Sequence, residues 1–130
     1  MNNKTLLLVN SSESLMYITK IMLEHCGYTV YCATNLDAVW KMMNLVNPDG
    51  IILDNETPDC YGFEYCRELR KKTGIPIMLI SARREDEIPA IVAGADGFMR
   101  KPLDCEIMKA RVGAMLITEK CEIIEKMSII

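Results

Sequence analysis

Five short apolar runs alternate along the chain with longer stretches in which apolar residues recur every three or four positions. The runs occupy residues 5–9, 29–33, 50–53, 76–80 and 97–100, and most are rich in Val, Ile and Leu. Runs of this length without polar alternation are typical of strands buried on both faces of a parallel sheet. The stretches between them have the period of amphipathic helices.

Each expected strand is followed by the signals of a helix. Side chains at 10–12 cap the first helix, Asn35 begins the second, and Asp104 caps the last, which continues through at least Leu116. Pro89 is most comfortable in the first turn of a helix, so the expected helix at 85–92 either begins late or is poorly ordered. The apolar faces of the first three helices are defined by Leu15, Ile18, Met22 and Cys26; by Leu36, Val39, Trp40 and Met43; and by Phe63, Cys66 and Leu69. Five such units in series predict an α/β fold with a doubly wound parallel sheet.

Polar residues stand where three of the expected strands end. The central run, 50–53, ends on Asp54, and Ser81 and Lys101 follow the next two runs. Ligands of open α/β sheets bind at the carboxyl edge of the strands. A carboxylate, a hydroxyl and an ammonium at that edge suit a phosphoryl group carried on the carboxylate, because the lysine offsets charge and the serine hydrogen-bonds an oxygen. Alternatively, these residues only cap turns or are solvated.

Composition and charge narrow the class of protein. The 130 residues, 50% hydrophobic and 25% charged, fit one globular domain with one core. A formal net charge of −3 gives no basic field for phosphate backbones, so we expect no nucleic-acid binding by this chain alone. The first apolar run is too short for a signal peptide or a membrane span, so we expect a cytoplasmic protein without a membrane partner.

We expect the six cysteines and ten methionines to pack in the core, and not to form disulfides or a metal site. Without a secretory signal, reduced thiols are expected. No C-x-x-C pair occurs and His25 is the only histidine, so a structural zinc site would need unpatterned ligands. We interpret the cysteines as small buried hydrophobes and the methionines as core filler.

Three stretches together resemble the receiver domain of two-component response regulators across nearly the whole chain. They are PDGIILDNETPD followed by Gly62 and Phe63, then PIMLISAR, and then GADGFMRKPL, in that order and spacing. The resemblance implies a flavodoxin-like (CheY-like) fold, a five-stranded parallel sheet of order 2-1-3-4-5 with helices on both faces.

The resemblance also assigns roles to single residues. It implies that Asp54 accepts a phosphoryl group from the phosphohistidine of a sensor histidine kinase, beside the family's lysine at Lys101. Ser81 and Phe98 match the switch residues, which move after phosphorylation and remodel a protein-interaction face. Such a domain is a signalling module and not an enzyme with turnover on a small molecule.

One departure from the family concerns Mg²⁺. The family usually has two consecutive acids after the first strand, and the matching positions here are Asn10 and Ser11. Mg²⁺ prefers charged oxygen ligands, so we expect weak binding at Asp54, the Asn10 amide oxygen and the backbone carbonyl of Glu56. Glu13 or the Glu56 side chain compensates for the lost charge, or both are solvated loop charges.

Three functional classes follow from these features. Retention of Asp54, Ser81, Lys101 and Phe98 favours a phosphorylation-operated receiver, whereas Asn10 with Ser11 favours a pseudo-receiver that acts through protein contacts alone. A flavin-binding enzyme would need an anion-binding loop after the first strand, which residues 10–12 only faintly resemble.

The last expected helix resembles that of the OmpR/PhoB class of DNA-binding transcription regulators, especially at 110–112. In that class the helix at 85–92, the strand at 97–100 and the last helix form a face that pairs two receivers symmetrically. Arg111 matches the arginine of that interface, Asp96 stands on its acidic side, and Ile107 replaces a common glutamate. We therefore expect a weak homodimer. Alternatively, Ile107 faces the sheet and Arg111 is solvated.

We expect the receiver domain to span residues 1–117. Residues 118–130 include apolar positions at helical spacing and either continue the last helix or link to a DNA-binding effector domain that this chain lacks. A partner surface and a disordered chain end are the alternatives.

Overall fold

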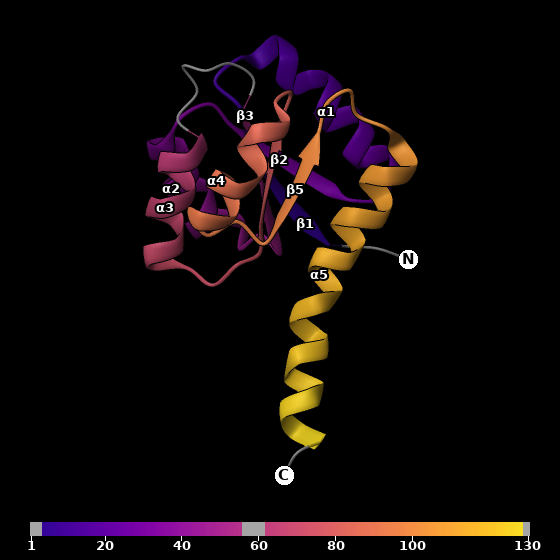
Figure 1. Ribbon diagram of the computed structural model, residues 1–130. Helices are drawn as coiled ribbons and strands as arrows, with labels where there is room; N and C mark the ends of the chain where they lie inside the picture. The colour runs from indigo at the N-terminus through magenta and orange to yellow at the C-terminus, as the bar shows by residue number, and fades with distance from the viewer. Residues whose placement is uncertain (1–3, 56–61, 129–130) are drawn as a thin grey trace.

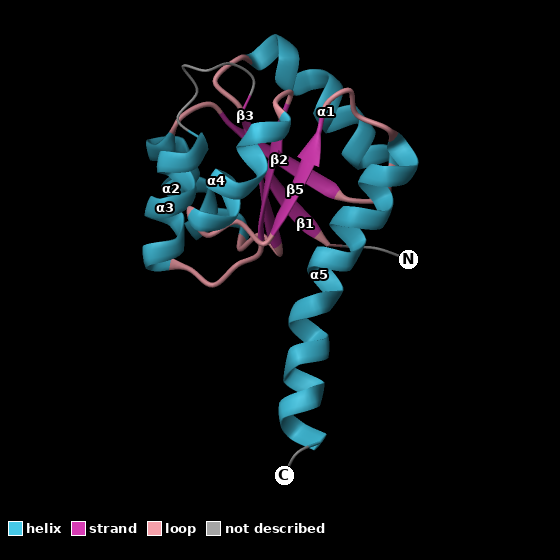
Figure 2. Cartoon of the chain, in the orientation of Figure 1, coloured by secondary structure: helices cyan, strands magenta, loops and turns pink. Residues whose placement is uncertain are grey.

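One parallel five-stranded sheet organises the fold, in the order β2-β1-β3-β4-β5 (Figures 1 and 2). The computed structural model describes residues 4–55 and 62–128, with side chains described as far as residue 117. The strands are β1 (Thr5–Val9), β2 (Thr29–Ala33), β3 (Gly50–Asn55), β4 (Ile77–Ser81) and β5 (Gly97–Arg100). The predicted fold class and strand order are confirmed.

Five α-helices connect and follow the strands. They are α1 (Glu13–His25), α2 (Leu36–Val46), α3 (Gly62–Lys72), α4 (Glu87–Val92) and α5 (Cys105–Ser128). The 3-10 turn η1 (Arg84–Asp86) precedes α4, so this helix begins later than residue 85 and Pro89 lies in its first turn, as predicted. Asp104 Oδ1 accepts hydrogen bonds from the backbone N–H groups of residues 106 and 107, which confirms the predicted cap of α5.

The helices cover the two faces of the sheet separately. Side chains of α1 and α5 pack on one face, and those of α2, α3 and α4 pack on the other (Figure 1). The three central strands, β1, β3 and β4, are buried on both faces, which explains their lack of polar alternation, whereas the edge strands β2 and β5 each keep exposed residues.

The predicted apolar face of α1 is partly wrong. Leu15 and Ile18 are exposed, and the residues buried against the sheet are Met16, Thr19 and Leu23. The helix carries apolar residues on more than one side, and the polar Thr19 interrupts the stripe that is buried. A count of apolar positions therefore favours the wrong face.

The C-terminal part of α5 leads away from the sheet as a continuous helix to Ser128 (Figure 1). The proposed boundary at residue 117 stays a prediction. No helix in the described part of the chain has the length and apolarity needed to cross a bilayer.

The described cysteines are free, but they are not uniformly buried. Cys66 lies in the core, Cys26 and Cys32 are half-buried, and Cys105 is exposed, so the prediction that all are buried hydrophobes is wrong for Cys105. Burial raises the pKa of the Cys66 thiol, which keeps it protonated and unreactive at neutral pH.

Candidate functional site

Asp54 and Lys101 meet at the carboxyl edge of the sheet. Asp54 is the residue before the last in β3. Its side chain has no exposed surface, whereas the side chain of Lys101 is 18% exposed. Lys101 Nζ lies 2.9 Å from Asp54 Oδ1. A buried carboxylate needs such a partner because its desolvation is costly. The ammonium thus holds one carboxylate oxygen and reaches solvent with the rest of its surface.

Thr19 holds the second oxygen of Asp54. Its hydroxyl donates to Asp54 Oδ2 over 3.2 Å, and both side chains are buried. Thr19 comes from the sheet-facing stripe of α1, so this contact joins a helix on one face of the sheet to the end of the central strand. Each oxygen of the carboxylate therefore faces a donor.

Asn10 lies beside Asp54 at the end of the neighbouring strand. The register pairs Val9 with Leu53, so Asn10 and Asp54 are the next pair and point to the same face of the sheet. The backbone N–H of Ser12 donates to Asn10 Oδ1 over 2.9 Å. This bond requires the oxygen of the amide to face Ser12, which leaves Nδ2 on the other side. Asn10 is 2% exposed, and within the described part of the chain its Nδ2 has no hydrogen-bond partner.

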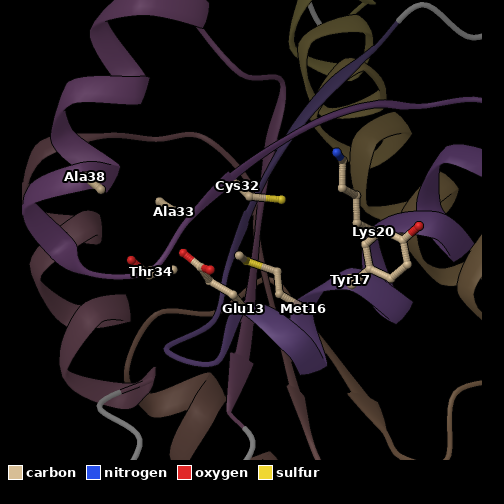
Figure 3. Close-up of a pocket in the computed structure, with 8 residues that line it drawn as sticks. All are labelled: Glu13, Met16, Tyr17, Lys20, Cys32, Ala33, Thr34 and Ala38. Atoms are coloured by element: carbon tan, nitrogen blue, oxygen red, sulfur yellow. The ribbon is translucent and has the colours of Figure 1, made fainter.

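Of the two acids expected to compensate for Asn10 and Ser11, Glu13 does not lie at this site. Ser11 and Glu13 are exposed. Glu13 lines a separate cleft of about 350 Å³ between α1 and β2, together with Ala33 and Thr34 (Figure 3). Glu56 lies outside the described residues. The geometry thus supports a solvated role for Glu13.

Ser81 lies at the same edge, but its hydroxyl is held elsewhere. Ser81 Oγ donates to Asp86 Oδ2 over 2.5 Å and accepts from the backbone N–H of Arg83 over 3.1 Å. In the register Ser81 pairs with Asn55 and not with Asp54, so the side chains of Ser81 and Asp54 point to opposite faces. A hydroxyl has one proton, so Ser81 does not donate to Asp54 while it is bound to Asp86.

Phe98 is buried in the core formed with α2, α3 and α4, one strand away from Ser81. Its carbonyl oxygen accepts a hydrogen bond from Arg111 Nη1 over 3.0 Å. Ile107 is 48% exposed on α5, whereas its neighbour Met108 faces the core. The alternative that Ile107 faces the sheet is therefore wrong.

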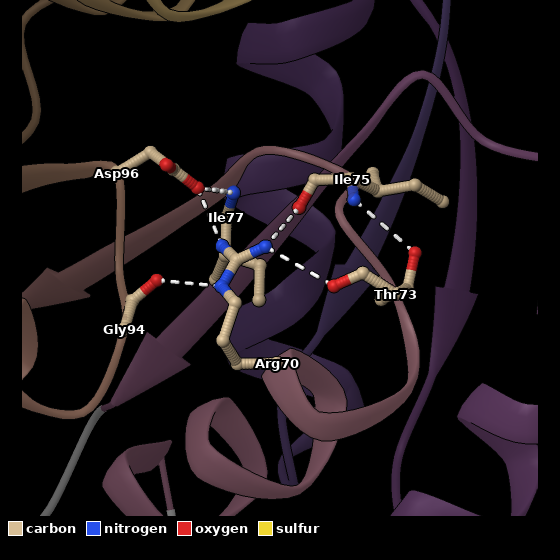
Figure 4. A network of polar contacts seen from close by, with 6 residues as sticks. All are labelled: Arg70, Thr73, Ile75, Ile77, Gly94 and Asp96. Carbon is tan, nitrogen blue, oxygen red and sulfur yellow. Dashed lines mark hydrogen bonds and ion pairs between the residues drawn. The ribbon is translucent and has the colours of Figure 1, made fainter.

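Asp96 is engaged within its own chain. Its Oδ2 lies 2.5 Å from Arg70 Nη2 and accepts the backbone N–H of Ile77 over 2.9 Å (Figure 4). Arg70 also donates to the carbonyl oxygens of Thr73, Ile75 and Gly94. This network fastens the end of α3 to the segments that begin β4 and β5. Any contact of Asp96 with a second molecule competes with Arg70.

Comparison with known proteins decides the family. Residues 6–113 match the family described as the response regulator receiver domain. This chain belongs to the response regulator receiver family. It is 34% identical over 112 residues to the sensory transduction protein BceR of Bacillus subtilis, covering 85% of this chain and 48% of that protein. It is 35% identical over 117 residues to the alkaline phosphatase synthesis transcriptional regulatory protein PhoP of the same organism, covering 88% and 49%.

A solved structure agrees with the fold of this receiver. The N-terminal domain of the nisin resistance regulator NsrR has a TM-score of 0.75 at 28% identity, and the match covers 88% of this chain and 99% of that one. The receiver spans about half the length of the curated relatives it matches.

Receiver domains typically bind Mg²⁺ at acidic residues, but the described residues of this receiver do not fit that ion. No cluster of three or more His, Cys, Asp or Glu that could hold a metal occurs among them. The Asn10 amide oxygen already accepts one hydrogen bond from the backbone N–H of Ser12, and both oxygens of Asp54 face donors. The site offers N–H and O–H groups where Mg²⁺ needs oxygen ligands.

Two polar residues of the site were missed from the sequence. Thr19 carried a signal, because a hydroxyl interrupts the buried stripe of α1 between Met16 and Leu23. Asp86 carried a weaker signal, an acid just before a helix and five residues after Ser81. Neither spacing indicates which side chain will be its partner.

Proposed function

We propose that this receiver is operated by phosphorylation, with Asp54 as the acceptor and the phosphohistidine of a sensor histidine kinase as the donor. The observation that carries the proposal is the buried carboxylate of Asp54 at the end of the central strand, 2.9 Å from Lys101 Nζ. A carboxylate oxygen attacks phosphorus and forms an O–P bond. The N–P bond breaks, its electron pair stays on the imidazole nitrogen, and Lys101 offsets the charge of the phosphoryl oxygens.

The switch in this proposal is an exchange of partners by Ser81. Its hydroxyl leaves Asp86 and donates to a phosphoryl oxygen on Asp54, which loosens the contact between β4 and the segment that begins α4. Phe98 on the next strand follows the same movement. The receiver thereby changes a protein-interaction face without turning over a small molecule.

The second candidate is a pseudo-receiver that acts through protein contacts without phosphorylation. The observation that favours it is the neutral pair of Asn10 and Ser11 where the family has acids. Incubation with acetyl phosphate, followed by the intact mass, separates the two. A gain of one phosphoryl group supports the first candidate, and an unchanged mass with and without Mg²⁺ supports the second.

We further propose that any Mg²⁺ binding is weak, because Asn10 and Ser11 supply no charge and the Asn10 amide oxygen already accepts the backbone N–H of Ser12. Replacing both neutral residues by acids, Asn10→Asp with Ser11→Asp, should tighten binding at least about tenfold, or roughly 1.4 kcal/mol, because the ion prefers charged oxygens. Calorimetric titration of both proteins measures this. Equal affinities would contradict it and point to Glu56 as a working acid.

The kinase contact is proposed on the exposed side of α1 beside Asp54. Leu15, Ile18 and Met22 line a shallow cleft of about 260 Å³ with the residues that follow β5, and Thr19 and Lys101 lie in its wall. A partner histidine that reaches Asp54 passes over this apolar surface. The cleft therefore suits an apolar helix surface of the kinase.

Ile18→Asp should slow phosphoryl transfer from the kinase about tenfold or more, because an apolar contact of this size is worth about 1.5–3 kcal/mol. Transfer from acetyl phosphate should not change, since that donor needs no docking surface. Leu45→Asp on α2 is the matched control, because Leu45 is also exposed but lies on the other face of the sheet. Equal kinase-dependent rates for both variants would rule the surface out.

The proposed homodimer uses the face formed by α4, β5 and α5. Exposed apolar side chains on this face are Ile88, Ile91, Val92 and Ile107. Asp96 is already paired with Arg70, and exposed ion pairs contribute only about 0–1 kcal/mol. The apolar residues therefore supply most of the association, with Arg111 at their edge.

Arg111→Glu should shift the monomer–dimer equilibrium toward monomer by several-fold, because it breaks the bond to the Phe98 carbonyl and places a charge beside an apolar contact. Sedimentation at several concentrations, with and without a phosphoryl donor, measures the shift. Arg67→Glu, the same charge change on exposed α3, should sediment like the wild type. Monomer profiles for all three proteins would exclude the dimer.

In the whole regulator we propose that this switch controls transcription through a DNA-binding effector domain. The length of the curated relatives and the name of PhoP support this role. DNA binding should come from that domain, since this chain carries a net charge of −3. Retention of DNA by this chain alone at moderate salt would contradict the assignment.

A further inference from the structure

The polar groups around Asp54 form a set of donors. Thr19 Oγ1 donates to Oδ2 over 3.2 Å, and Lys101 Nζ lies 2.9 Å from Oδ1. Asn10 Nδ2 adds a further buried donor that has no hydrogen-bond partner among the described residues, and Asn10 follows Val9, which pairs with Leu53 just before Asp54. A buried donor without a partner is costly, so its retention at this position calls for a group that accepts from it.

The net charge of the site also favours an anionic ligand over a divalent cation. The carboxylate of Asp54 is balanced by the ammonium of Lys101, and Asn10 adds no charge. A dication would add two positive charges, and the described residues provide no group of three or more His, Cys, Asp or Glu there to hold it. Where a receiver has two more acids, those acids and the dication cancel each other, so their joint loss leaves the balance at the acceptor unchanged. The site of this chain is electrostatically complete without the ion.

We propose that Asp54 accepts and retains its phosphoryl group without a divalent cation, and that Asn10 Nδ2 and Thr19 Oγ1 are positioning donors in place of the metal. The proposal rests on the proposed function of Asp54 as acceptor. Thr19 fixes Oδ2 and thereby presents Oδ1 as the nucleophile. After transfer, Asn10 Nδ2 and Lys101 Nζ donate to the phosphoryl oxygens, where the negative charge then lies.

With acetyl phosphate as donor the step balances without a co-reactant. Asp54 Oδ1 forms an O–P bond, the P–O bond to the acetyl group breaks, and its electron pair leaves on acetate. The dianionic phosphoryl group gains the donors that the carboxylate gives up. Neither the O–P bond that forms nor the P–O bond that breaks requires a metal ion as an electron-pair acceptor.

The test compares labelling rates in Mg²⁺ and in EDTA by intact mass. The wild type should be labelled in EDTA at a rate within about threefold of that in Mg²⁺, because no ligand of the ion takes part. Asn10→Asp with Ser11→Asp should become dependent on Mg²⁺ by about tenfold or more, because two uncompensated acids repel the donor. Labelling of the wild type in Mg²⁺ alone would overturn the inference and leave the proposed function intact. No label in either solution would overturn both.

Substitutions that remove one donor at a time test the individual donors in EDTA. Thr19→Val should slow labelling about tenfold, because valine keeps the shape of threonine but lacks the hydroxyl donor. Thr19→Ser keeps the hydroxyl and should be labelled at the wild-type rate. Asn10→Ala should slow labelling similarly, with thermal unfolding showing that the variants remain folded. Wild-type rates for both folded variants would overturn the role of these donors. If Asn10→Ala does not fold, the comparison of Mg²⁺ and EDTA on the wild type still decides the proposal.

Discussion

Asp54→Asn should remove all phosphoryl labelling of this chain. The amide has nearly the shape of the carboxylate and keeps the burial of the site, but its oxygen is not a nucleophile toward phosphorus. The expected result is a change from one phosphoryl group per molecule to none, read from the intact mass after incubation with acetyl phosphate. A label that persists on the variant would place the acceptor elsewhere.

Two controls separate the loss of a nucleophile from other effects. Asp49→Asn makes the same chemical change on an exposed residue before the other end of β3, and it should be labelled like the wild type. Ser81→Ala should also accept a label, because the hydroxyl of Ser81 is bound to Asp86 and not to the acceptor. Loss of the label in Asp49→Asn would show that the assay responds to something other than the acceptor.

The three central strands could be predicted because each is buried on both faces, whereas the strand order was implied by the family resemblance. A run such as 51–53 has no polar residue, so neither its type nor its place in a covered sheet is ambiguous. Asp54 could be predicted for the same reason, since the first charge after such a run must lie at the sheet edge. The same pattern on β5 selects Arg100, the first charge there, so the role of Lys101 came from the family resemblance.

The partners of these residues could not be predicted, because a strand end specifies an edge but not a face. Ser81 ends β4 at the same edge as Asp54, yet alternation turns its side chain to the opposite face, where Asp86 holds it. Thr19 was overlooked because helical periodicity weighs apolar residues, and the buried stripe of α1 includes one hydroxyl. Polar contacts across elements depend on register and helix rotation, which the one-dimensional pattern leaves open.

Lys101→Met should destabilise the fold by about 3 kcal/mol, the lower end of the range for removing one partner of a buried ion pair. The side chain of Asp54 has no exposed surface, so its carboxylate cannot replace the ammonium with water without opening the site. The lower end applies because Lys101 itself is 18% exposed. Methionine keeps the length and most of the apolar stem of lysine, so the loss reflects charge and not packing.

Urea unfolding of a double-mutant cycle isolates this effect. In the Asp54→Asn background, Lys101→Met should cost about 1 kcal/mol or less, because the neutral amide no longer needs a cation beside it. The difference between the two backgrounds is the coupling between carboxylate and ammonium, about 2 kcal/mol or more, visible as a shift of the midpoint at constant slope. Equal losses in both backgrounds would show that Lys101 contributes through its stem or another contact. The carboxylate of Asp54 would then need a different source of stabilisation, of which the hydroxyl of Thr19 is the nearest described candidate.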